Sequence, residues 1–164
     1  NLASRRPRMA TVCLTLPEWS VVVDAAWLRI VASDVKGLDA AKTYKRSMAE
    51  RISEEITGAA GEMAVAKWSG RFFVPSVNTF HRVPDCLGNV EVRSTRHSDG
   101  HLLVRDNDAT DRRCVLAIVA TDVTLAGWIL GKDAQRPEWR RASRRSDRQA
   151  WWVPQPDLQS MDSW

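Results

Sequence analysis

The spacing of apolar residues divides the chain into a helical first part and an alternating second part. Apolar positions recur at helical intervals through residues 17–33, 38–52 and 57–69. After residue 70 the pattern becomes alternation, which predicts strands over residues 71–77, 80–83, 90–95, 101–105, 114–121 and 123–130. Helices followed by strands indicate an α+β fold, in which N-terminal helices pack on a mostly antiparallel sheet of five or six strands.

Two features of the predicted helices stand out. Thr15 and Glu18 have the spacing of a capping box, so the first helix is expected to begin near residue 17. Apolar residues then cover most of its circumference and leave only a narrow polar strip that includes Ser20 and Asp24, so we expect this helix to be mostly buried. The third helix has a surface of glycine and alanine that predicts close approach of another element, and Glu62 is the one acid within it.

Length and composition are those of a single globular domain. The chain has 164 residues, of which 44% are hydrophobic and 27% are charged. Its longest apolar runs are far shorter than the roughly 20 residues that a bilayer span needs, and no apolar segment follows the N-terminal arginines. We therefore expect a protein without a membrane partner, in the cytoplasm. The three cysteines form no CxxC pair and are expected to be reduced packing residues.

The excess positive charge lies in one stretch. Lys and Arg exceed Asp and Glu by 24 to 20, and residues 134–148 account for the whole difference. Six arginines lie there: Arg136, Arg140, Arg141, Arg144, Arg145 and Arg148. Guanidinium groups grip phosphates and nearby indoles stack on bases, which predicts a nucleic-acid partner. We favour DNA over RNA as this partner, although no residue of the sequence decides between them. The alternative is a solvated arm that keeps the protein soluble. We therefore divide the chain into a domain over residues 1–133 and an Arg- and Trp-rich segment over residues 134–164, packed on that domain or extending from it.

Three charged residues surround the predicted turn at residues 87–89. Asp85 ends one predicted strand and Glu91 begins the next, so a hairpin would bring the two carboxylates together. Arg93 lies two residues beyond Glu91 and shares its face of the strand. Two carboxylates beside a cation suit Mg²⁺-assisted hydrolysis of a phosphodiester.

Glu62, the pair Pro84-Asp85 and the run Glu91-Val92-Arg93 together resemble the PD-(D/E)xK nuclease superfamily, which includes restriction endonucleases and phage exonucleases. The resemblance covers about residues 57–121 and implies a restriction-endonuclease-like core. It further implies that Glu62, Asp85 and Glu91 hold Mg²⁺, or Mn²⁺, and that Asp85, Glu91 and Arg93 are catalytic, with Arg93 at the position of the family's lysine. The general run of the sequence also resembles small proteins of tailed bacteriophages, which would place the protein in the cytoplasm of the host cell.

Other functions fit the same residues. Arginine stays protonated and cannot act as a base, so a catalytically inactive nucleic-acid-binding protein with this fold is one alternative. A phage accessory protein that binds a host protein through its Trp- and Arg-rich tail is another. In a purely structural interpretation, Asp85 caps a turn, Glu91 and Arg93 form a solvated pair, and Glu62 is an exposed helix acid. The sequence leaves the oligomeric state open.

Overall fold

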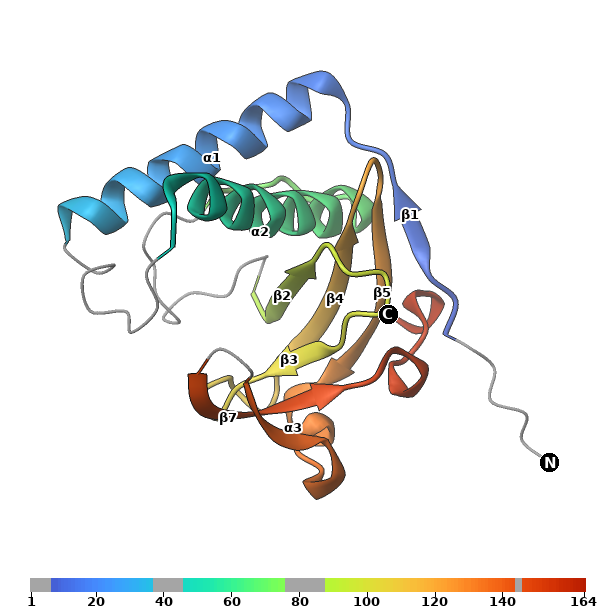
Figure 1. Cartoon of the computed structure of the whole chain (residues 1–164). Helices are drawn as coiled ribbons and strands as arrows, with labels where there is room; N and C mark the ends of the chain where they lie inside the picture. The colour runs from blue at the N-terminus through green and yellow to red at the C-terminus, as the bar shows by residue number, and fades with distance from the viewer. Residues whose placement is uncertain (1–6, 37–45, 76–87, 144–145) are drawn as a thin grey trace.

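The computed structural model describes residues 7–36, 46–75, 88–143 and 146–164, and its fold is α+β, as the sequence predicts. Among these residues there are two long helices, one short helix and two sheets, in place of the single five- or six-stranded sheet that we expected. None of the helices in these described ranges is both long enough and apolar enough to cross a membrane. In Figure 1 the long helices form the upper layer and the sheets lie below them.

Helix α1 (Leu16–Val35) begins at the predicted capping box. The Thr15 hydroxyl accepts a hydrogen bond from the backbone N–H of Glu18 at 3.4 Å, and the Glu18 carboxylate accepts one from the backbone N–H of Thr15 at 2.6 Å. The prediction that α1 is mostly buried is wrong. Its inner side is buried, but Val23, Trp27 and Val31 on the outer side are exposed.

Helix α2 (Met48–Trp68) is continuous, where the sequence predicted two helices with a break near residue 55. It begins at a second capping box, formed by Ser47 and Glu50. The Thr57 hydroxyl donates to the Ser53 carbonyl at 2.6 Å, so this polar residue is accommodated within the helix instead of ending it. Residues 38–45 of the predicted second helix lie outside the described ranges.

The four-stranded sheet has the order β1-β5-β4-β2 and is mixed. Its strands are β1 (Ala10–Val12), β2 (Val90–Thr95), β4 (Arg113–Val119) and β5 (Val123–Leu130). Within the described part of the chain β2 is at one end of this order and pairs with β4 in parallel, while the other pairs are antiparallel. A predicted strand over residues 71–77 is wrong for residues 71–75, which form no strand; residues 76–77 and the predicted strand at 80–83 lie outside the described ranges.

The three-stranded sheet unites a strand from the middle of the chain with the Arg-rich segment. It has the order β3-β7-β6 and comprises β3 (Leu102–Val104), β6 (Arg140–Ser143) and β7 (Ser146–Val153). All pairs are antiparallel. A short helix, α3 (Gly131–Ala134), and a 3-10 turn over Pro137–Trp139 lead into β6, and two further 3-10 turns, Gln155–Asp157 and Met161–Ser163, follow β7.

The four-stranded sheet separates two apolar cores. Val90 and Val92 of β2 face the helices and pack in the first core with residues of α1 and α2. The alternate residues of the sheet face the three-stranded sheet, where Leu116 joins Leu102 and Val153 in the second core. The close approach predicted for the glycine- and alanine-rich surface is found at Gly61, where an added Cβ would lie 2.0 Å from the Ser94 hydroxyl oxygen.

Candidate functional site

Glu91 and Arg93 lie together on β2, on the face opposite the helices. The parallel register sets Glu91 beside Cys114 and Arg93 beside Leu116, and both neighbours belong to the second core. Glu91 is 4% exposed. Arg93 Nη1 donates to Glu91 Oε1 at 2.5 Å. The structure thus brings together two of the three residues that the resemblance marks as catalytic.

Asp108 is the second carboxylate on Arg93. It is 5% exposed, and its two oxygens accept from Arg93 Nη2 at 2.8 and 2.9 Å. One oxygen also accepts from the backbone N–H of Arg105 at 2.8 Å. Sequence reasoning missed Asp108, because it lies fifteen residues after Arg93 in a loop with no helical or strand periodicity. One feature of the sequence could have indicated its role. Asp108 lies three residues after Arg105, a spacing at which an aspartate side chain can accept a hydrogen bond from a backbone N–H within a turn.

The cluster around these carboxylates carries excess positive charge. Arg112 Nη1 donates to Glu91 Oε2 at 3.3 Å, and Arg93 Nε donates to the carbonyl of Leu103 on β3 at 3.2 Å. Partial removal from water lowers the pKa of Arg105, and the charge of Arg93 lowers it further; Arg148 acts in the same direction. Arg93, Arg105 and Arg112 therefore lie around the two carboxylates, which gives three positive charges against two negative ones.

Cys114 lies in the second core, next to the cluster of arginines and carboxylates. Burial raises the pKa of its thiol to about 12, and the negative charge of Asp108 adds to this effect. At neutral pH the residue is a neutral apolar contact beside the charged cluster. The prediction that the cysteines are reduced packing residues agrees with this site, whereas Cys13 is exposed and Cys86 lies outside the described ranges.

The outer face of the three-stranded sheet carries further arginines. Register pairs Leu103 with Trp152 and Ala150 with Arg141, and alternation along β7 sets Arg148 on the same face. Arg105 follows β3 and lies close enough to Arg148 for their charges to interact. We call Arg105, Arg141, Arg148 and Trp152 the basic face.

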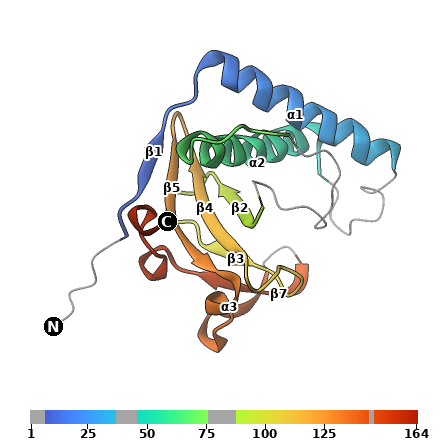
Figure 2. The ribbon, with the colours of Figure 1, turned by 180° about the vertical axis from the view of Figure 1, so that it is seen from behind.

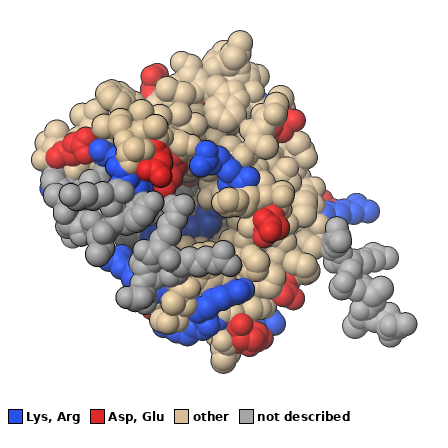
Figure 3. Space-filling view, in the orientation of Figure 1, with Lys and Arg blue, Asp and Glu red and all other residues tan. Residues whose placement is uncertain are grey.

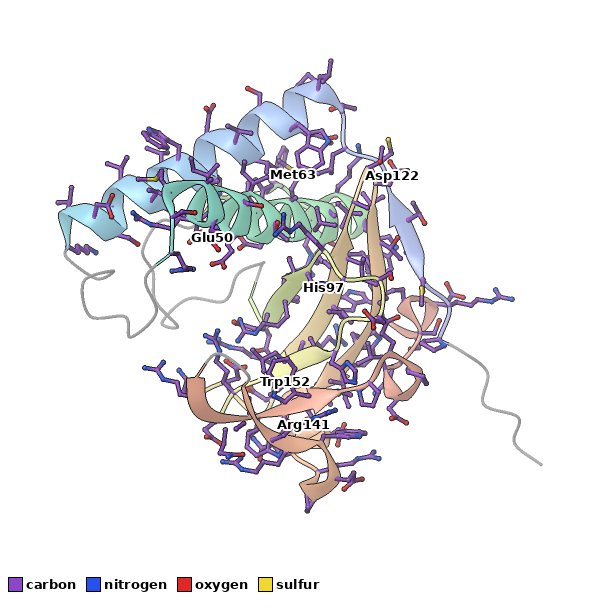
Figure 4. All side chains as sticks on the ribbon, in the orientation of Figure 1. Glu50, Met63, His97, Asp122, Arg141 and Trp152 are labelled. Atoms are coloured by element: carbon purple, nitrogen blue, oxygen red, sulfur yellow. The ribbon has the colours of Figure 1, made fainter. Side chains whose placement is uncertain are left out.

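Trp152 is half-buried within the basic face, and its buried indole N–H has no hydrogen-bond partner among the residues that the structure describes. The arginines around it are exposed. Figure 4 shows Trp152 and Arg141 on this sheet, and Figure 3 shows Lys and Arg atoms inside and below a hollow between the helices and the sheet. The basic face therefore offers exposed guanidinium groups around an indole.

Two other arginines of the segment are engaged with the chain itself. Arg140 stacks on Trp151, with its guanidinium carbon 4.5 Å from the ring centroid, and pairs with Asp106 at 2.8 Å. Arg136 stacks in the same way on Trp139 at 4.6 Å. Arg144 and Arg145 lie outside the described ranges. The predicted nucleic-acid-binding set thus divides into Arg141 and Arg148 on the basic face and two arginines held by tryptophans.

Glu62 lies apart from Glu91. It is 6% exposed on α2, and its oxygens accept from Arg29 Nη1 and Nη2 of α1 at 3.0 and 2.6 Å. Because α2 covers the face of the sheet that carries Val90 and Val92, Glu62 and Glu91 belong to opposite sides of β2. The expectation of an exposed helix acid, in the purely structural interpretation, is wrong.

Asp85, the remaining predicted ligand and catalytic residue, lies outside the described ranges. Within those ranges, no three His, Cys, Asp or Glu side chains come together as a metal-binding group. Glu62 and Glu91 each form a salt bridge with arginine. The described part of the site is therefore an arginine and carboxylate cluster.

Comparisons with protein-family models, with curated proteins and with solved structures find no match to this chain.

Proposed function

We propose that the protein binds nucleic acid through the basic face. The observation that carries this proposal is the set of three exposed arginines, Arg105, Arg141 and Arg148, around Trp152. The neighbouring carboxylates Glu91, Asp108 and Asp106 form salt bridges with Arg93 and Arg140. The exposed guanidinium groups of the basic face would attract phosphates. We further propose DNA as the preferred partner and the cytoplasm as the location, that of the host cell if the protein is phage-encoded.

The salt dependence of affinity tests this proposal. Each phosphate neutralised on a duplex contributes about −0.9 to the slope of log K against log salt concentration, so three arginines contribute about −3. Fluorescence anisotropy with labelled single-stranded and duplex DNA and RNA, at a series of salt concentrations, measures this slope. Replacing Arg105, Arg141 and Arg148 by glutamine should weaken binding and make the slope shallower by about 3.

The matched control removes three cations elsewhere. The variant with Arg8, Lys36 and Lys132 replaced by glutamine has the same net charge as the basic-face variant, but its substitutions lie at other exposed positions. It should keep the wild-type slope. Equal slopes for the two variants would mean that binding follows net charge alone, and the proposal would fail.

A metal-dependent nuclease is the second candidate. The observation that favours it is the convergence of two buried carboxylates, Glu91 and Asp108, on Arg93, within the motif that resembles the PD-(D/E)xK superfamily. Carboxylate oxygens are the ligands that Mg²⁺ and Mn²⁺ prefer, and a metal there would polarise a phosphodiester. Binding a metal would require Arg93 to release at least one of its carboxylates.

Cleavage assays separate the two candidates. Single-stranded and duplex DNA and RNA are incubated with Mg²⁺ or Mn²⁺ and wild-type protein, Asp85→Ala or Glu91→Gln. Cleavage that both substitutions abolish, with nucleic-acid affinity unchanged, would support the nuclease. Cleavage at the same rate in both variants would rule out this site as its source.

A further inference from the structure

The outer side of α1 is an apolar surface that packs on nothing in the described chain. Its members are half to almost fully exposed: Leu16, Val21, Val23, Trp27, Leu28, Val31 and Val35. Seven of the eleven exposed large hydrophobic residues of the described chain therefore lie on this one helix. Figures 1 and 2 show from opposite sides that α1 is the outermost layer of the molecule. We call these seven residues the apolar outer face.

The helix does not need this face to hold its own fold. Its inner side, with Val22, Ala25, Ala26 and Ile30, is already buried. A helix at the surface of a soluble protein normally carries polar residues on its solvent side. Here the outer side has only Ser20, Asp24 and Asp34 as polar members, and Asp34 is held by Arg51 at 2.6 Å. Apolar patches of this extent mark interaction surfaces.

We propose that the apolar outer face binds the same face of a second copy of this chain, so that the protein forms a two-fold symmetric dimer. The order of residues along α1 fits an antiparallel helix pair whose two-fold axis passes between residues 25 and 26. In that register Leu16 lies opposite Val35 of the other copy and Val23 lies opposite Leu28, at positions that are exposed in both cases. Near the axis, Trp27 lies opposite the exposed Asp24 of the other copy. Each contact then occurs twice, as two-fold symmetry requires.

The available area approaches that of a specific interface. The exposed parts of the seven residues sum to roughly 700 Å² per copy, which is the most that this face could bury, against the roughly 800 Å² per partner of a standard specific interface. The most exposed residues, Leu16 at 86% and Val35 at 83%, lie at the two ends of α1, so the contact would extend along the whole helix. Trp27, 53% exposed, lies near the middle, where tryptophan contributes most to an interface.

Asp24 limits the strength of this dimer. It is exposed and lies within two residues of the proposed axis, so the two copies would bring like charges close together. Removing the charge should therefore strengthen association, an effect that a general disturbance of the surface would not produce. The inference is independent of nucleic-acid binding, because α1 and the basic face belong to different layers of the molecule.

Sedimentation equilibrium over about a hundredfold range of protein concentration, without nucleic acid, tests the proposal. Wild-type protein should change from monomer to dimer within this range. Trp27→Glu should raise the dissociation constant at least about tenfold, and Asp24→Asn should lower it several-fold. Phe72→Glu is the matched control, since Phe72 is 91% exposed and outside α1, and it should dimerise like the wild type.

Two results would overturn the proposal. The first is a monomer at every concentration for both the wild type and Asp24→Asn. The second is a dimer that Trp27→Glu and Phe72→Glu weaken equally, because association would then depend on another surface. Circular dichroism of each variant checks that the fold is intact, and the exposed positions make a loss of fold unexpected.

Discussion

Arg93→Met should destabilise the protein by about 3 kcal/mol, because it leaves two buried carboxylates without their common cation. Arg93 donates four hydrogen bonds, to Glu91, to both oxygens of Asp108 and to the Leu103 carbonyl. Glu91 and Asp108 are 4% and 5% exposed, so water cannot replace these bonds. Breaking a buried ion pair on one side costs about 3–5 kcal/mol.

The lower end of that range applies, since neither carboxylate would be entirely alone. Arg112 still donates to Glu91 at 3.3 Å, and the backbone N–H of Arg105 still donates to Asp108 at 2.8 Å. Arg93→Lys keeps the charge but loses the planar fork that serves both carboxylates, so it should cost about 1–2 kcal/mol.

Urea unfolding followed by circular dichroism measures these losses. Arg140→Met is the control, because Arg140 also holds a carboxylate with two nitrogens but its pair with Asp106 is exposed. Losing this pair together with the stacking on Trp151 should cost no more than about 1 kcal/mol. Combining Arg93→Met with Glu91→Gln and Asp108→Asn should restore part of the stability, because both buried carboxylate charges are then removed. A loss below about 1 kcal/mol for Arg93→Met would refute the reasoning that these carboxylates need the arginine.

Three further predictions concern single positions. Thr15→Ala removes the N-cap of α1 and should cost about 1 kcal/mol in urea unfolding. Gly61→Ala should cost about 1–3 kcal/mol, because its Cβ would lie 2.0 Å from the Ser94 hydroxyl oxygen. Gly58→Ala is the control and should not destabilise the protein, because the nearest atom to its Cβ would be 4.0 Å away. Equal losses of stability in the two variants would contradict the close packing at Gly61. Burial, with a further contribution from Asp108, raises the pKa of Cys114 from 9.0 to about 12, so above pH 9 the unfolded chain releases this proton and the native chain retains it. The stability of wild-type protein relative to Cys114→Ala should therefore fall by up to about 1.4 kcal/mol per pH unit above pH 9. If the difference in unfolding free energy between the two proteins stayed constant from pH 8 to about pH 11, the burial effect would be contradicted.

Local chemistry made the beginning of α1 predictable. Its capping box depends only on residues three apart, so Thr15 and Glu18 identify the start of the helix without knowledge of the rest of the fold. The exposure of α1 was not predictable in this way. Trp27 and Val31 have the apolar character of core residues, and which side of a helix is covered depends on how many elements pack around it.

The sequence also could not divide the strands between two sheets. Alternation predicted strands that the structure has as β2, β3, β4 and β5, but alternation says nothing about which strand pairs with which. The β6–β7 hairpin lies in the segment that we considered only for its charge. Its apolar residues Ala150 and Val153 are buried, and their spacing along β7 is interrupted by two tryptophans that conceal the alternation.

In the candidate site, too, some contacts follow from the local sequence and others depend on the tertiary fold. That Glu91 and Arg93 share a face follows from the two-residue period of a strand and required no fold. Which carboxylate joins them does not follow from any period. Asp108 reaches Arg93 because β3, a strand of the other sheet, passes within hydrogen-bond distance of the Arg93 side chain, and the turn after β3 closes on the Arg105 N–H. Likewise Glu62 pairs with Arg29, thirty-three residues earlier, because α1 and α2 lie side by side. A buried carboxylate takes a cation that the tertiary fold brings to it, so spacing alone predicts the geometry of a motif and not the charges that surround it.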